Sequence, residues 1–437
     1  MNDKSWISLS ILPNLTQTLA VAFFAALLTG CSWGPSLPTP EEQSEKIEQF
    51  ITEGGYSASR NYRIDSIHET WRHDGQTVEV SMLAPKTVGV YPLIIYLPGL
   101  GESAEGGRLW RETWAKAGFA VFSVQPAEIS AALKELAPMF GKPGDDQDNE
   151  EDSSDSDKSR PSRAVRNNEL HYLGHQYFSQ ASLKKRVDHL LWAYAQLKQR
   201  ATAGQALFKS ADLSRVIIAG YDLGAQTVEE MIGEKFEANL PAAQDIHPLA
   251  AILFSPSVDM ALGNLANRYK NISMPLLVVT GSDDDDPYGI SSAYVRTAIW
   301  EYAPPGNKYL LLLNKADHRL LAGSNLSHRH QADSSMQEYA EKNGPSESMR
   351  RFGMSNSVRG GGGRRSGGMA AGPWTGMGRP QHDGRQDGKQ DAKHIAAVFS
   401  ISTAFLDSIS KSDKFAQSWL SGKSGLWLKK SASLKIK

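Results

Sequence analysis

One stretch decides the fold class of this chain: IIAGYDLGAQT, residues 217–227. It begins with apolar, β-branched residues that are typical of a buried strand, and it continues as a helical pattern from about Ala225. Two glycines, Gly220 and Gly224, enclose three residues, and a residue without Cβ lets the backbone turn sharply. The stretch therefore predicts a strand, a tight turn and a helix, with Asp222 in the turn.

Similar strand patterns recur on both sides of this stretch and alternate with helical ones. The predicted strands lie at 78–83, 91–97, 120–124, 216–219, 251–254, 275–280 and 309–313. The predicted helices include 108–118, 182–197, 225–236 and 395–406. This alternation predicts an α/β fold with a mostly parallel central sheet and helices on both faces. A chain of 437 residues, 40% of them hydrophobic, is long enough for one large domain of this class.

Two segments lack the apolar residues that a packed core needs. The first is acidic and the second is rich in Gly, Ser, Arg and Gln, so we expect disordered insertions at about 141–168 and 322–391. The second contains RGGGGRR, but a net charge of −1 argues against a protein that binds nucleic acid. The single domain is then expected over 62–420, with a C-terminal tail over 421–437.

The N-terminus has the features of an export signal. A charged start and an apolar run at 19–28 precede Cys31, which is the only cysteine of the chain. The run is short for a membrane-spanning helix, which needs about twenty apolar residues. We therefore expect a signal peptide over 1–30 and a tether with an N-terminal segment over 31–61.

The residues around this cysteine, LTGC at 28–31, resemble the bacterial lipobox. In that family of signals the cysteine thiol receives a lipid and the chain is cut just before it. The resemblance implies that Cys31 anchors the protein to a membrane of the bacterial envelope. Because Ser32 follows the cysteine, it also implies the outer membrane of a Gram-negative cell, facing the periplasm or the surface.

Polar or glycine-rich turns follow four of the predicted strands, at the end where α/β sheets place their functional groups. They are PGLGE at 98–102, GYDLG at 220–224, GSDDDDP at 281–287 and KADH at 315–318. Their order resembles the α/β-hydrolase fold, in which a nucleophile, an acid and a histidine each follow their own strand. The layout is similar to that of the dienelactone hydrolase and platelet-activating-factor acetylhydrolase-like branch.

The resemblance implies a role for each of these turns. Asp222 takes the nucleophile position, and His318 is the base. Asp284 is the expected acid, with Asp283 and Asp286 as alternatives because four acids stand in a row.

The oxyanion hole is assigned by the same resemblance to the backbone N–H groups of Leu100 and Leu223. No cofactor is expected. His171 and His175 have helical spacing but lack the glutamate of the zinc-protease motif, so no metal site is expected either. The sequence specifies no oligomeric state.

An aspartate in place of serine or cysteine leaves two interpretations open. A carboxylate can attack a saturated carbon and form an ester that a histidine-activated water hydrolyses, as in haloalkane dehalogenases and epoxide hydrolases. This chain differs from both, since Leu223 replaces a halide-binding Trp and 98–101 read PGLG instead of His-Gly-x-Pro. The chain is then either a hydrolase of a small or lipid-like ester or related bond, or a catalytically silent lipoprotein that binds a ligand or partner.

Overall fold

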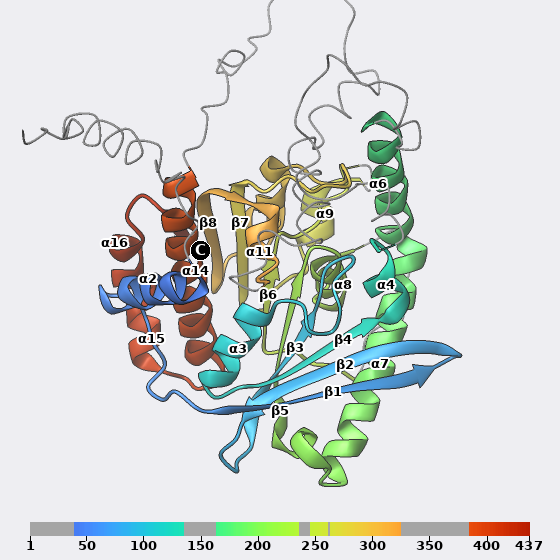
Figure 1. Cartoon of the computed structure of the whole chain (residues 1–437), viewed down its shortest axis with the longest axis horizontal. Coiled ribbons are helices and arrows are strands. Elements are labelled where there is room, and N and C mark those ends of the chain that lie inside the picture. Colours follow the sequence, from blue (N-terminus) through green and yellow to red (C-terminus); the bar gives the residue numbers. More distant parts are fainter. Residues whose placement is uncertain (1–38, 135–162, 236–244, 261–262, 325–383) are drawn as a thin grey trace, which may run out of the picture.

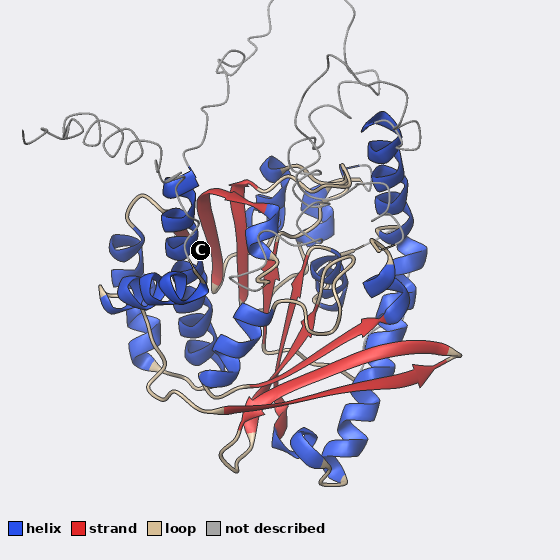
Figure 2. Ribbon diagram, viewed as in Figure 1, coloured by secondary structure: helices blue, strands red, loops and turns tan. Residues whose placement is uncertain are grey.

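The computed structural model describes residues 39–134, 163–235, 245–260, 263–324 and 384–437. At its centre is one sheet that is covered by helices on both faces (Figures 1 and 2). This arrangement confirms the predicted α/β fold with a mostly parallel sheet. The expected signal peptide and Cys31 lie outside the described residues, as do most of the two expected insertions.

Nine strands of the described chain form the sheet, in the order β1-β2-β4-β3-β5-β6-β7-β8-β9. Their bounds are β1 Ile64–His73, β2 Gln76–Pro85, β3 Tyr91–Leu97, β4 Ala120–Pro126, β5 Ala211–Tyr221, β6 Ala250–Phe254, β7 Leu276–Asp283, β8 Lys308–Asp317 and β9 Ala432–Ile436. The six strands from β4 to β8 pair in parallel, whereas β1, β2 and β9 are antiparallel additions at the two edges.

One face of the sheet is covered by α2 and α3 and by the C-terminal helices, and the other by α7 to α10. The helices on the first face are α2 Pro40–Thr52, α3 Arg108–Lys116, α14 Gly384–Ser410, α15 Lys414–Ser418 and α16 Ser424–Leu428, with a π-helical turn at Trp419–Lys423. Those on the second are α7 Gln180–Thr202, α8 Leu223–Met231, α9 Leu265–Tyr269 and α10 Ala298–Tyr302, with 3₁₀ turns at Ala206–Ser210 and Ala293–Thr297. Three further helices lie at the ends of these elements. Helix α4, Ala127–Ala131, follows β4; helix α6, Arg163–Tyr177, precedes α7; and helix α11, His318–Leu321, follows β8.

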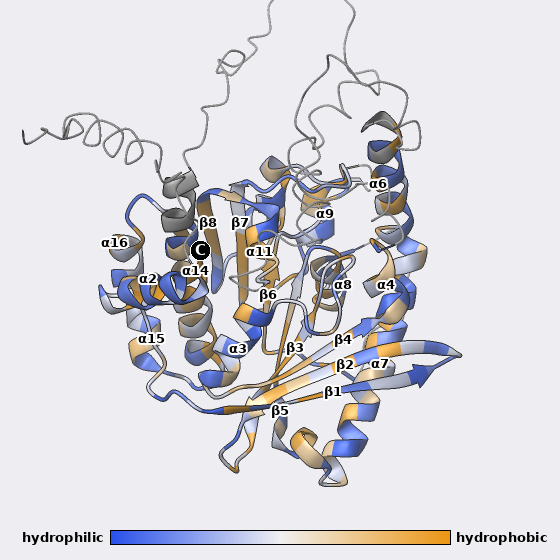
Figure 3. Ribbon diagram, in the orientation of Figure 1, coloured by the Kyte–Doolittle hydropathy of each residue, from blue (hydrophilic) through white to orange (hydrophobic). Residues whose placement is uncertain are grey.

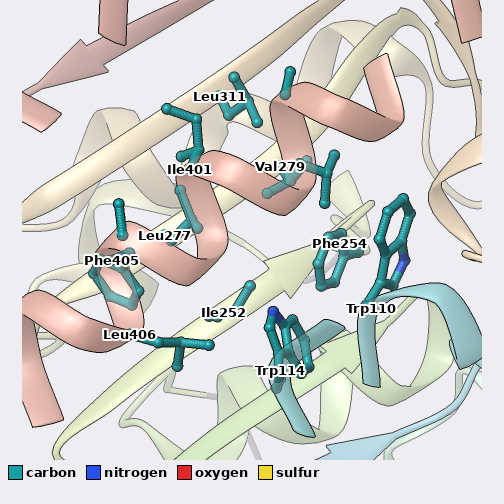
Figure 4. Close-up of a cluster of buried hydrophobic side chains, with 14 of the residues drawn as sticks. Trp110, Trp114, Ile252, Phe254, Leu277, Val279, Leu311, Ile401, Phe405 and Leu406 are labelled. Carbon is teal, nitrogen blue, oxygen red and sulfur yellow. The ribbon is translucent and has the colours of Figure 1, made fainter. Parts of the chain in front are cut away.

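The strand residues alternate between two buried cores, as the period of a β-strand requires. In β5, Ile217 and Ala219 belong to the core under α14, and Val216 and Ile218 to the core under α7 and α8. Figure 4 shows the first core, where residues of β6, β7 and β8 meet α14 and two tryptophans of α3. Apolar residues therefore form continuous runs in the middle of the central strands, whereas the β1–β2 hairpin is mixed (Figure 3).

The folded domain extends beyond the expected limits of 62–420 at both ends. Part of the expected tether forms α2, whose Ile47 is buried against the core under α14. Part of the expected tail forms α16 and β9, and β9 pairs with β8. Both ends are held because apolar residues in these polar segments are buried in the core under α14, among them Ile47, Leu428 and Ala432. In the described part of the chain, no helix is both long and apolar enough to cross a membrane.

Candidate active site

Asp222 lies in the tight turn between β5 and α8. Its backbone has φ 51° and ψ −113°, a strained combination for a residue with a side chain. The two glycines make this turn possible: a Cβ on Gly220 would lie 2.5 Å from the Gly224 carbonyl, and one on Gly224 would lie 2.0 Å from the Leu97 oxygen. The turn therefore holds the carboxylate of Asp222 at the carboxyl edge of the sheet.

His318 begins α11 after β8 and connects two carboxylates. Its Nδ1 lies 2.7 Å from Asp284 Oδ1, and its Nε2 lies 3.6 Å from Asp222 Oδ1. A carboxylate can only accept, so Nδ1 carries the proton that is donated to Asp284. In the neutral ring, Nε2 then has a bare lone pair on the side of Asp222, as a general base requires.

Of the three acids left open by the sequence, the structure brings Asp284 to the histidine. Asp284 is 0% exposed, and its other oxygen accepts a hydrogen bond from Thr280 Oγ1 at 2.7 Å. Asp283 is exposed and bonded to Ser282. Asp286 is buried, but its carboxylate accepts backbone N–H groups of its own loop.

Arg296, which the sequence reasoning missed, is the buried cation of the site. It is 0% exposed, its Nε lies 3.3 Å from Asp284 Oδ1, and its Nη2 lies 4.0 Å from Asp286 Oδ2. It also donates to the backbone carbonyls of Ser255 and Asp284. The guanidinium thus joins the loops after β6 and β7 and compensates the charge of the acids behind His318.

The two oxygens of the Asp222 carboxylate have different surroundings. The Leu100 backbone N–H donates to Oδ2 at 3.3 Å, whereas Oδ1 has no hydrogen-bond partner in the described part of the chain. The structure therefore brings the expected oxyanion-hole residue Leu100 to Asp222. Leu223 opens α8 directly after Asp222, but no hydrogen bond joins its N–H to that carboxylate among the described residues.

The pKa of His318 reflects opposing influences. Burial of the ring lowers the pKa, whereas the hydrogen bond to Asp284 and the charges of both aspartates raise it, so that the pKa lies above its ordinary value of 6.5. The charges around the ring therefore favour an imidazolium. This agrees with a site in which carboxylates outnumber the guanidinium.

Glu102, in the turn after β3, is a second group that the sequence reasoning missed. Its Oε2 accepts the Gly99 N–H at 2.8 Å and so closes the turn that presents Leu100. Burial, together with the charge of Asp222, raises the pKa of Glu102 from 4.5 to about 7, although the Gly99 hydrogen bond opposes this. The protonated form of Glu102 is therefore favoured by folding.

This shift predicts a pH-dependent loss of stability. Because the folded pKa of Glu102 is raised, its favourable contribution is complete below pH 4.5 and is lost as the pH rises to about 7. Glu102→Gln retains an acceptor for Gly99 but has no proton to lose. Over this pH range we therefore expect the free energy of unfolding of Glu102→Gln to fall by about 1–2 kcal/mol less than that of the wild type. Denaturant titrations at several pH values measure it, with the exposed Glu105→Gln as control. Equal pH dependence in wild type and Glu102→Gln would contradict the assignment.

An apolar cluster covers the Leu100 side of the site. Leu100 and Leu223 pack in it with residues of α4, of α6 and the turn after it, and of the loop after β7, namely Ile129, Leu170, Tyr177, Phe178 and Tyr288. Asp222 is accordingly only 2% exposed and His318 only 9%. The immediate surroundings of the carboxylate are therefore dry, which strengthens its electrostatic interactions.

Two histidines of α6 lie next to each other and contact the loop after β7. His171 Nε2 and His175 Nε2 are 3.0 Å apart, and His171 Nδ1 lies 2.8 Å from the Tyr288 carbonyl oxygen. Within the described ranges, no group of three or more His, Cys, Asp or Glu side chains is placed to hold a metal ion.

Neither a protein-family model nor a curated protein matches this chain.

Proposed function

We propose that this protein is a hydrolase of the α/β-hydrolase fold in which Asp222 is the nucleophile and His318 the base. The observation that carries the proposal is the asymmetry of the Asp222 carboxylate. Its Oδ2 accepts the Leu100 N–H, whereas its Oδ1 has no hydrogen bond among the described residues and lies 3.6 Å from His318 Nε2. The order of nucleophile, acid and histidine after β5, β7 and β8 also supports it.

The asymmetry suits a two-step reaction. In the first step Asp222 Oδ1 attacks a saturated carbon of an ester or related electrophile, and the leaving group departs with its electron pair. In the second step His318 Nε2 takes a proton from water, and the water oxygen attacks Asp222 Cγ. Negative charge then develops on Oδ2, where the Leu100 N–H already donates. The Cγ–Oδ1 bond breaks, and the product alcohol leaves with Oδ1 and the proton from His318.

The apolar cluster over the site favours a small or lipid-like substrate. A lipid on Cys31 would place the hydrolase at the bacterial envelope. In an α/β-hydrolase that has lost its usual nucleophile, the same burial of Asp222 and His318 also supports a second candidate, a catalytically silent protein that binds a ligand or partner.

The experiment that tests the proposal is a single turnover in heavy-oxygen water. The full chain, purified from membranes and in excess over substrate, is mixed with short-chain esters, an epoxide and an alkyl halide, and then digested for mass spectrometry. We expect the peptide of Asp222 to gain about 2 Da, because the water oxygen stays in the carboxylate after Oδ1 leaves. The same digest shows whether Cys31 carries a lipid.

The alternatives give different results in this experiment. Direct attack of water on the substrate puts the label in the product alone and leaves the Asp222 peptide unchanged. A silent protein turns over none of the probes. Either result would overturn the role of Asp222 as nucleophile for these bonds.

A further inference from the structure

A cavity of 440 Å³ lies beside the junction of α6 and α7, and none of the three groups Asp222, Asp284 and His318 lines it. Its walls come from α4, α6, α7 and the start of β2. The volume is in the range of pockets that take small molecules.

Arg186, on the inner wall of this cavity, is a buried cation that forms no ion pair among the described residues. It is 7% exposed, and within the described part of the chain it donates only to neutral acceptors: Thr227 Oγ1 at 2.9 Å, the Tyr177 carbonyl at 2.5 Å and Gln226 Oε1. No carboxylate in the described part of the chain lies within ion-pair distance of it. Three of the five N–H donors of a guanidinium are used in these bonds, so two remain.

A buried charge of this kind is costly until an anion joins it. Burial lowers the pKa of Arg186 to about 9, and the charge of Asp222 offsets only part of this effect. An anion in the cavity would meet a guanidinium that is already fixed in place by Thr227, Gln226 and Tyr177, so that little side-chain entropy would be lost on binding.

Two more nitrogen-bearing side chains of α7 line the same cavity. Lys185 is exposed at its rim, and His189 is 8% exposed, with an Nδ1 that has no partner among the described residues. His189 Nε2 lies 2.8 Å from Gln76 Oε1, which fixes the ring. Residues 185, 186 and 189 have the spacing of one helix face. Glu128 is the only carboxylate among the described lining residues, so the fixed charge that they carry is positive.

We infer that this cavity binds a phosphate group, carried by a soluble small molecule or by a lipid headgroup. The fork of Arg186 and the point charge of Lys185 can contact different oxygens of one tetrahedral anion. The site is separate from the proposed chemistry at Asp222 and does not depend on it.

Calorimetric titration of the full chain with inorganic phosphate at low ionic strength tests the site. We expect saturable binding that Lys185→Ala weakens about tenfold, because it removes one charge in contact with the ligand. Lys184→Ala is the matched control, since Lys184 is the exposed neighbour on α7 and does not line the cavity. It should change the affinity less than about twofold. Lys185 is exposed, so its replacement leaves the fold intact, as thermal unfolding checks.

Further ligands define the anion and its source. Acetate should bind more weakly than phosphate, and acetate binding of equal strength would overturn the assignment to phosphate. Preference for glycerol 3-phosphate over the diester glycerophosphoglycerol indicates a soluble monoester, and the reverse indicates a lipid headgroup. The absence of saturable phosphate binding, or equal weakening by Lys184→Ala and Lys185→Ala, would show that the cavity is no phosphate site.

Discussion

Asp222→Asn is expected to lower kcat by about 10⁴-fold on any substrate that the wild type hydrolyses. The amide keeps the size of the side chain and can still accept the Leu100 N–H, but it has no anionic oxygen in the place of Oδ1. The loss should therefore fall on the chemical step, while thermal unfolding and KM change little. Steady-state kinetics on a substrate found in the heavy-oxygen screen measures the effect.

Asp283→Asn is the matched control for this variant. Asp283 stands next to the acid Asp284 but is exposed and bonded to Ser282, so its loss should leave kcat within about twofold of the wild type. An Asp222→Asn enzyme that retains more than about a tenth of the wild-type rate would rule out covalent catalysis by Asp222. If the wild type is inert and Asp222→Ser gains esterase activity, the natural protein is catalytically silent and binds a ligand or partner instead.

The central fold could be predicted because its sequence signal is local. Strands such as β3 and β6 are continuous apolar runs with turn residues after them, and a buried parallel strand requires such a run. The edge strand β1 was missed because one of its faces is largely exposed and its residues are mixed. β9 was missed for a similar reason, since ASLKI buries little more than Ala432.

The start of helix α2 carries a helix signal in its sequence. Thr39 and Glu42 form a capping box, and Pro40 stands at the first helical position, which together mark a helix start inside the polar segment that was expected to be a tether. Composition alone suggested a linker. The capping pattern, followed by the apolar residues Ile47 and Phe50, identified the helix better.

Some residues of the candidate site could likewise be predicted from the sequence, and others could not. The order of Asp222, Asp284 and His318 could be predicted because each follows a strand that ends at the same edge of the sheet. The burial of Arg296 could not, because it depends on loops after β6 and β7 that meet only in the fold. Arg186 was detectable in principle, since it interrupts the apolar stripe of α7 between positions that are buried.

His318→Gln is expected to stop the reaction at the covalent intermediate. The attack of Asp222 Oδ1 on the substrate needs no base, because the carboxylate oxygen is itself the nucleophile. The release step needs His318 Nε2 to take a proton from water, and glutamine cannot do so. We expect kcat to fall by about 10³-fold, with a burst of leaving group that is stoichiometric with enzyme.

The accumulated intermediate distinguishes this mechanism from its alternatives. Mass spectrometry of His318→Gln after mixing with substrate should show the product group attached to the peptide of Asp222, and Asp222→Asn in the same background should abolish the adduct. The control His68→Gln replaces an exposed histidine of β1 and should turn over at the wild-type rate. If His318 instead activates water for direct attack on the substrate, its loss lowers kcat without any burst or adduct, because no bond to Asp222 ever forms. The burst therefore tests the nucleophile and the base together, since it requires Asp222 to react and His318 to be needed only afterwards.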